Sequence, residues 1–132
     1  MCVEFLDHLN NLNKKGEMYM LIVEAYYRVK PGKRDELIKI AQINIDATRK
    51  EVGNITYNHY PSSEDTQGMF VFEIWENEEV FNYHPKTEHH KQFCMDRRPL
   101  IEPNSYKITM YNAEVNEERT NSARAFATKN ID

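Results

Sequence analysis

The stretch "MFVFEIWE" (residues 69–76) places the strongest constraint on how this chain can fold. If it forms a strand, successive side chains alternate between its two sides. Both sides are then largely apolar, with Phe70, Phe72 and Ile74 on one and Met69, Val71 and Trp75 on the other. Such a pattern is typical of a central strand that is covered on both faces, and the run is too short to cross a bilayer. The chain is therefore expected to build its core around a sheet.

The remaining elements can be predicted from turn residues and apolar periodicity. We expect strands over residues 20–29, 54–60 and 105–115, and a helix over 34–52 with Gly53 as its C-terminal cap. A short helix over 77–84 would close at Pro85, and Thr87 would cap a helix that ends before Pro99. The resulting order, β-α-β-β-α-α-β, predicts an α+β fold of the ferredoxin-like sandwich type.

This domain would span residues 20–115, with a leader (1–19) before it and a polar tail (116–132) after it. Phe5, Leu6, Leu9 and Leu12 would line one face of a short helix in the leader. Alternatively, "KKGE" (residues 14–17) is what a purine-rich ribosome-binding site encodes when read in frame, in which case Met20 is the natural start. The tail is expected to be mobile unless a partner holds it.

The net charge and the cysteines limit which binding partners and which cellular compartment can be expected. A net charge of −4 gives no reason to expect a nucleic acid or an anionic membrane as partner. Cys2 and Cys94 form no Cys-x-x-Cys pair, which suits a reducing compartment, so we expect a cytoplasmic protein. Helices on one side of the sheet would leave the other apolar face bare, and this predicts a homodimer.

Three of the five histidines lie close together in "NYHPKTEHH" (residues 82–90). His84 and His89 are five residues apart with Pro85 between them, unlike the i, i+4 pair of a zinc-binding helix. A third ligand would have to come from His59 or Glu73, which no spacing rule supports, so no metal is predicted. His89 and His90 fall in a first helical turn, where the helix dipole disfavours protonation and a neutral imidazole can accept a proton. They are equally compatible with ordinary solvated residues.

Other candidate residues lie on the predicted strands. Glu73 shares a strand face with Trp75, and a carboxylate on so apolar a strand needs a buried partner or a cavity. Tyr57 and His59 share one face of the second strand and would join a polar pocket or a dimer interface. The sequence shows no Ser or Cys nucleophile with a base, no phosphate-binding glycine loop and no dinucleotide fingerprint. We therefore expect no nucleotide cofactor.

Three stretches resemble the antibiotic biosynthesis monooxygenase family: "VKPGKRDEL" (29–37), "EVGNITY" (51–57) and "EIWENEEVFNYHPKTEHHK" (73–91). The resemblance covers residues 20–115 and implies a dimeric α/β barrel with one pocket per subunit and no cofactor. Four positions match the family motif: Glu73, Trp75, His84 and His89. Val71 stands where anthrone-oxidising members carry asparagine, and Ala25 where haem-degrading members do. Haem degradation is therefore not expected, and anthrone oxidation is in doubt.

The resulting hypothesis is a cofactor-free monooxygenase that acts with dioxygen on a small planar phenol or quinol. His84 or His89 would be the base, and Glu73 would orient a histidine. Trp75 and Tyr57 would wall the substrate slot, with His59 and Val71 as further substrate-binding residues. Two alternatives use the same residues: an isomerase of a small hydroxyketone, as in the autoinducer-processing branch, and a non-catalytic dimeric binding or stress protein.

Overall fold

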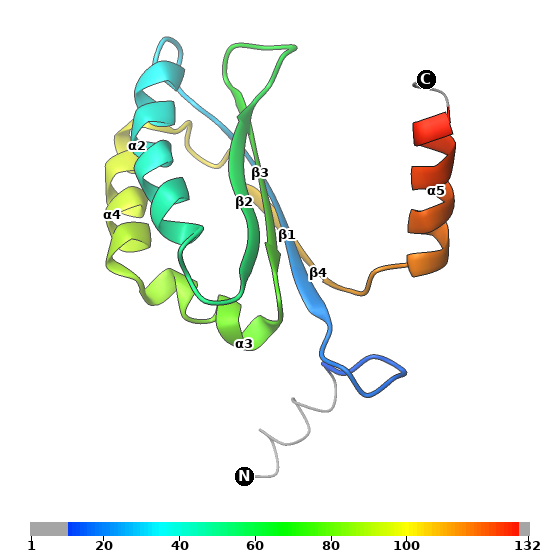
Figure 1. Cartoon of the computed structure of the whole chain (residues 1–132). Helices are drawn as coiled ribbons and strands as arrows, with labels where there is room; N and C mark the ends of the chain where they lie inside the picture. The colour runs from blue at the N-terminus through cyan, green and yellow to red at the C-terminus, as the bar shows by residue number, and fades with distance from the viewer. Residues whose placement is uncertain (1–10, 130–132) are drawn as a thin grey trace.

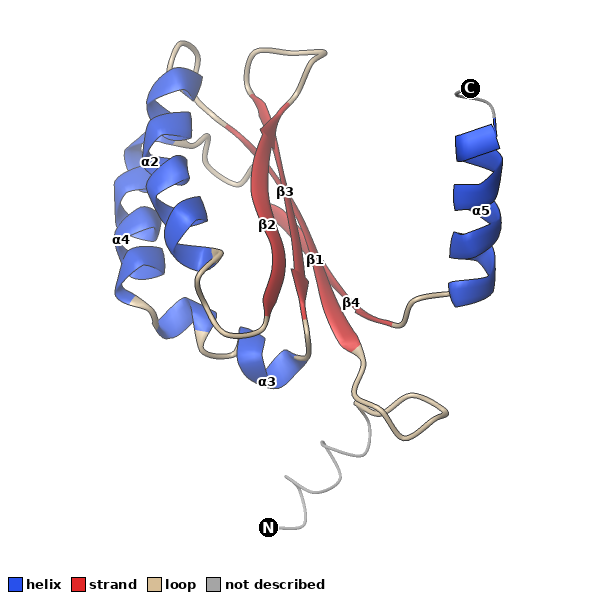
Figure 2. Cartoon of the chain, viewed as in Figure 1, coloured by secondary structure: helices blue, strands red, loops and turns tan. Residues whose placement is uncertain are grey.

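A four-stranded antiparallel sheet forms the centre of the molecule, in the order β2-β3-β1-β4 (Figures 1 and 2). The computed structural model describes residues 11–129. Its strands are β1 (Met20–Arg28), β2 (Asn54–Pro61), β3 (Gly68–Trp75) and β4 (Lys107–Ala113). The sequence predicted that the strand apolar on both sides is central, and this is confirmed because β3 pairs with β2 and β1.

Two helices, α2 (Arg34–Thr48) and α4 (Glu88–Arg97), cover one face of the sheet (Figure 1). The chain has the predicted ferredoxin-like α+β fold. The predicted helix over 34–52 is shorter, because residues 49–52 form turns that lead to Gly53 at φ +84°. The predicted helix over 77–84 splits into α3 (Glu78–Phe81) and a 3₁₀ turn (His84–Lys86) that contains Pro85. A second 3₁₀ turn (Arg98–Leu100) follows α4.

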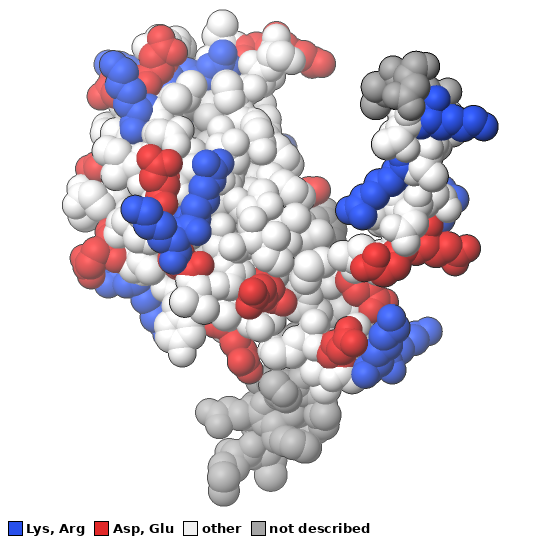
Figure 3. Space-filling view, in the orientation of Figure 1, with Lys and Arg blue, Asp and Glu red and all other residues white. Residues whose placement is uncertain are grey.

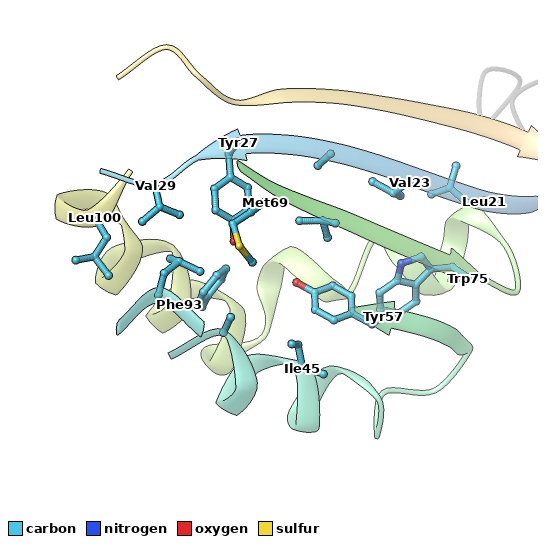
Figure 4. Close-up of a cluster of buried hydrophobic side chains, with 14 residues drawn as sticks. Leu21, Val23, Tyr27, Val29, Ile45, Tyr57, Met69, Trp75, Phe93 and Leu100 are labelled. Atoms are coloured by element: carbon cyan, nitrogen blue, oxygen red, sulfur yellow. The ribbon is translucent and has the colours of Figure 1, made fainter. Parts of the chain in front are cut away.

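The core lies between the sheet and these helices (Figure 4). Strand β1 alternates strictly between buried and partly buried residues, so one of its sides faces the core throughout. The largest fully buried side chains include Trp75, Tyr27, Leu37 and Met69. These residues fix β3 and α2 relative to each other, and this in turn positions the polar groups described below.

Within residues 11–129, no further layer covers the opposite face of the sheet. Register places Phe70, Phe72 and Ile74 on this face, opposite Tyr26, Glu24 and Ile22 of β1. Phe70 is 38% exposed. We call the set formed by these three β3 residues and their three β1 partners the open face. On the helical side, acidic and basic side chains are interspersed in the view of Figure 3, as expected for a chain of small net charge.

Residues 117–129 form a helix that the sequence analysis did not predict. Helix α5 (Glu117–Lys129) stands clear of the sheet on the side away from α2 and α4, and none of its residues is buried (Figure 1). The sequence analysis described this segment only as a polar tail, and its mobility stays a prediction. The Asn116 side chain accepts a hydrogen bond from the Arg119 backbone N–H, and two glutamates occupy the first turn. Both features favour the start of a helix at this position, although the sequence carries no apolar stripe from which the helix could be predicted.

The segment before β1 is a short turn. Leu12 pairs with Met18 in an isolated bridge, and the Asn13 side chain accepts hydrogen bonds from the Lys15 and Glu17 backbone N–H groups. Leu12 therefore does not lie in the predicted leader helix, and Phe5, Leu6 and Leu9 fall outside the described residues. Among residues 11–129, no helix is long and apolar enough to cross a membrane.

Candidate active site

A cavity of about 180 Å³ lies between the sheet and the segment that links α3 to α4. Its apolar lining consists of Val71, Phe81, Pro85 and Ile108. Its polar lining consists of Tyr57, Glu73, His84, His90, Arg97 and Tyr106. Other hollows, such as one along β2 and one beside α3, contain no histidine. The first cavity is therefore the place where acid–base chemistry can be supported.

His84 is the most deeply buried histidine on this cavity, at 3% exposure. Its Nδ1 lies 2.7 Å from Glu51 Oε2, so in the neutral ring Nδ1 carries the hydrogen and donates a hydrogen bond to the carboxylate. Nε2 then holds a lone pair, and it is buried without a hydrogen-bond partner among the described residues. Burial, with a smaller effect of His89, lowers the pKa of His84 to about 4. At neutral pH the imidazole is therefore an unprotonated acceptor on the cavity.

Glu51 lies in the turn after α2 and holds two histidines. Its Oε2 is 2.7 Å from His84 Nδ1 and 3.2 Å from His89 Nε2. The other nitrogen of His89, Nδ1, lies 2.8 Å from Asn44 Oδ1. Burial raises the pKa of Glu51, and the neighbouring His89 works against that rise. Both nitrogens of His89 therefore face oxygen atoms, and the ring bridges Glu51 and Asn44.

A buried chain of hydrogen bonds continues from Asn44 toward β1. Asn44 Nδ2 donates to the Tyr57 hydroxyl at 2.9 Å. Tyr57 can then donate to His59 Nε2 at 3.1 Å, and His59 Nδ1 to the Tyr27 hydroxyl at 2.8 Å. Burial lowers the pKa of His59 to about 3 and raises that of Tyr57 well above its usual value. The chain is therefore neutral, and it fixes the orientation of Tyr57 at the cavity wall.

Glu73 and Trp75 form a second polar pair on β3. Trp75 Nε1 donates to Glu73 Oε1 at 3.1 Å, and the indole ring lies 5.0 Å from the His84 ring, centroid to centroid. Burial raises the pKa of Glu73 to about 7, although the Trp75 hydrogen bond opposes the rise. The sequence predicted that Glu73 orients a histidine. In the structure Glu73 binds Trp75, and Glu51 contacts the histidines.

The predicted site left out three residues that lie on α4 or next to it, although the sequence analysis considered His90 as a possible proton acceptor. His90 lies 4.2 Å from His84, centroid to centroid, and its Nδ1 is buried without a hydrogen-bond partner among the described residues. Arg97 and Tyr106 complete the cavity, with the Arg97 guanidinium carbon 5.0 Å from the Tyr106 ring centroid. His90 and Arg97 are seven residues apart on one helix, so they lie on the same face. This spacing was the signal in the sequence that could have placed both at the site.

The structure brings four of the seven predicted site residues onto the cavity. These are Tyr57, Val71, Glu73 and His84. The other three lie behind it: His89 on Glu51 and Asn44, His59 between two tyrosines, and Trp75 against His84. Within residues 11–129, no three His, Cys, Asp or Glu side chains gather as a metal site would require.

Comparison with known proteins identifies the family. The antibiotic biosynthesis monooxygenase family model matches residues 20–95. The chain belongs to this family. The matched segment runs from β1 into α4 and holds Glu51, Glu73 and the three clustered histidines, but it ends before Arg97 and Tyr106.

Individual proteins similar to this chain share only 25–31% of their aligned residues with it. The Synechocystis protein sll1783 is 31% identical over 71% of this chain, and the match spans 65% of that protein's length. YcnE of Bacillus subtilis is 29% identical over 62% of this chain and 86% of its own length. The crystal structure of a conserved protein from Methanosarcina mazei superimposes with a TM-score of 0.67 at 25% identity, over 73% of this chain and 94% of that one.

The buried histidines predict loss of stability in acid. The pKa values of His84 and His90 are held at about 4 and that of His59 at about 3, against 6.5 for an exposed histidine. Between pH 6.5 and 4 the unfolded chain therefore binds more protons than the folded one, and the free energy of unfolding falls as the pH falls. Glu73 acts oppositely, because its raised pKa stabilises the fold below about pH 4.5 and this contribution is lost as the pH rises to about 7.

The three histidines outweigh Glu73 and Glu51, whose pKa burial also raises, so the melting temperature measured by circular dichroism is expected to fall from pH 7 to pH 4.5. Glu73→Gln removes one opposing contribution and should make the fall steeper. A melting temperature that rises on acidification would show that the histidines do not stay neutral in the fold.

Proposed function

We propose that this chain is a cofactor-free monooxygenase that oxidises a small planar phenol, quinol or similar aromatic with dioxygen. Membership of the family supports monooxygenase activity in general. The observation that carries the finer proposal is the pairing of Glu51 with His84, a residue that lines the cavity and whose buried Nε2 finds no hydrogen-bond partner in the described part of the chain. A carboxylate behind a histidine fixes its tautomer and stabilises the imidazolium that forms when the histidine accepts a proton.

In the proposed reaction, His84 Nε2 removes the hydroxyl proton of the phenol. The electron-rich ring then reduces dioxygen, and the radical pair combines into a ring peroxide, which takes the proton back from His84. The hydroperoxide loses water, whose second hydrogen comes from the same ring carbon, and a quinone remains. One phenol and one dioxygen thus give one quinone and one water, with no external electron donor.

The neighbouring residues would support this chemistry without taking part in bond changes. Tyr57 and Val71 would wall the slot, and Trp75 would back the His84 ring through their 5.0 Å contact. His59 would hold Tyr57 in place through the 3.1 Å hydrogen bond. His89 would hold Glu51 in place, because its Nε2 lies 3.2 Å from that carboxylate and it does not line the cavity.

The direct test is oxygen uptake by the purified protein with methylhydroquinone, without added flavin or metal. We expect one dioxygen consumed per substrate and one ¹⁸O atom from labelled dioxygen in the product. A folded protein that leaves oxygen uptake at the rate of the buffer control would overturn the proposal. The same result with ligand binding retained would favour a non-catalytic binding protein.

One observation favours an isomerase as the second candidate. His84 is neutral and Glu73 has a pKa of about 7, so the cavity holds a proton acceptor beside a group that can donate. Such a pair can move a proton along a small hydroxyketone. Exchange of substrate hydrogen for deuterium in D₂O without oxygen uptake would identify this activity.

We further propose that two copies pair through the open face, which would complete a dimeric α/β barrel. Apolar side chains exposed on a sheet are usually covered by a partner, and Phe72 lies in the middle of this face. Light scattering is expected to give twice the chain mass at micromolar concentration. Phe72→Glu should yield monomer, whereas Val52→Glu, at a site that is 85% exposed outside the sheet, should leave the dimer intact. Monomer mass for the unaltered chain would refute this arrangement.

A further inference from the structure

Arg97 brings a positive charge to the cavity that the proposed reaction does not use. It is the last residue of α4 and a lining residue of the cavity. Its guanidinium carbon lies 5.4 Å from the Phe93 ring centroid and 5.0 Å from that of Tyr106. Within residues 11–129, no carboxylate lies within ion-pairing distance of Arg97. The two rings therefore hold a guanidinium at the cavity with its charge uncompensated by an acidic side chain.

The other groups on the cavity do not neutralise that charge. His84 and His90 are neutral at physiological pH, because burial keeps the pKa of each at about 4. Glu73 opposes Arg97 only when ionised, and burial raises its pKa to about 7. The field of Arg97 reaches several groups, since it lowers the pKa of both His59 and His90. Below pH 7 Arg97 is therefore the one charged side chain among the described residues that line the cavity.

The size of the cavity limits the ligand independently of its charge. An apolar cavity of about 150 Å³ holds one benzene molecule, whereas drug-sized ligands occupy pockets of about 300–1,000 Å³. A volume of about 180 Å³ matches a single ring with one or two small substituents. The apolar lining residues Val71, Phe81 and Ile108 suit the ring itself.

We propose that the substrate is a single-ring phenol carrying an anionic substituent such as a carboxylate, which Arg97 binds while the hydroxyl group faces His84. This assignment rests on the proposed function and names its substrate class. Guanidinium groups bind carboxylates through two parallel hydrogen bonds, and the planar Arg97 is held between aromatic rings. Arg97 is thus a specificity-determining residue, and it lies outside the segment matched by the family.

The test compares two ligands of nearly equal shape by calorimetry at pH 6 under nitrogen. 3-Hydroxybenzoate carries the negative charge, and 3-hydroxybenzamide replaces it with a neutral amide. We expect the benzoate to bind about ten- to a hundredfold more tightly to the unaltered protein, as for a charged hydrogen-bonded pair. Arg97→Gln should abolish this preference without weakening amide binding, and the control Arg98→Gln, at an exposed neighbouring position, should retain it.

Two further measurements keep the proposal open to refutation if Arg97→Gln does not fold. Arg97→Lys keeps the charge but not the planar group and should give an intermediate preference. Anthracene-9-carboxylate, with three rings and the same charge, should bind at least tenfold more weakly than 3-hydroxybenzoate, as estimated from the cavity size. Equal affinity for benzoate and benzamide, or no binding of either, would overturn the proposal.

The binding experiment distinguishes a failure of the Arg97 proposal from a failure of the proposed monooxygenase reaction. Binding is measured without dioxygen, so a benzoate preference that depends on Arg97 can stand even if no oxygen is consumed. Conversely, oxygen uptake with methylhydroquinone but no benzoate preference would leave the monooxygenase intact and remove the anionic subsite.

Discussion

Replacing His84 with glutamine is expected to lower the rate of oxygen uptake by about 10²- to 10⁴-fold, the usual contribution of a positioned general base. Glutamine keeps a polar side chain of similar length, although its amide nitrogen lies where Nε2 is in histidine and does not reproduce the 2.7 Å contact of Nδ1 with Glu51. It cannot accept the substrate proton. Steady-state oxygen consumption, with circular dichroism to verify folding, measures the effect.

Two variants serve as graded controls for this substitution. Glu51→Gln leaves His84 as a base but removes the charge that fixes its tautomer, so we expect an intermediate loss. His89→Gln disturbs the same carboxylate from outside the cavity and should cost less than Glu51→Gln. If folded His84→Gln protein keeps its rate within about twofold of the unaltered chain, His84 is not the general base.

Replacing Trp75 with alanine is expected to lower the free energy of unfolding by about 3–5 kcal/mol, as for other large-to-small changes in cores. Trp75 is 0% exposed and packs edge-on against Phe81 at 5.7 Å between ring centroids. In a domain of this size the loss corresponds to a fall of roughly 10–15 °C in melting temperature. Thermal denaturation followed by circular dichroism measures it.

Trp75→Phe separates the packing role of the ring from its hydrogen bond. The phenyl ring refills most of the space, so the melting temperature should fall much less than for alanine. Glu73 loses the indole N–H that now lowers its pKa, and its pKa should therefore rise above the present value of about 7. A titration of Glu73 by carboxyl NMR would show this. A small fall for Trp75→Ala would mean that the tryptophan contributes little to the core.

The fold could be predicted because local patterns and global burial agree. Because successive side chains of a strand point to its two sides in turn, the residues of β3 indicate that both sides are largely apolar. This pattern predicted that β3 is a central strand. Helix α5 was not predicted because none of its residues is buried, and its sequence therefore shows no periodic pattern of apolar residues. Its capping asparagine and first-turn glutamates were the remaining signals, and they indicate a helix only weakly.

The candidate site could be predicted only in part. His84, Glu73 and Trp75 lie in one continuous motif, and a strand and the turn that follows it bring them together. Glu51 is 33 positions away from His84, in a turn whose path depends on how α2 packs. A carboxylate in a turn resembles any solvated residue until the tertiary contact is known. The sequence therefore predicted two candidate histidines, His84 and His89, but not that Glu51 contacts both of them.

The contact between Gly53 and Val80 decides how the site can be altered in directed evolution. A Cβ atom at position 53 would meet Val80 Cγ2 at 2.5 Å, in a backbone conformation that side chains rarely adopt. Any larger residue there would push apart the two segments that carry Glu51 and His84, although position 53 itself does not line the cavity. Libraries that seek a new substrate preference are best confined to the cavity walls at Val71 and Ile108, with the turn at Gly53 left unchanged.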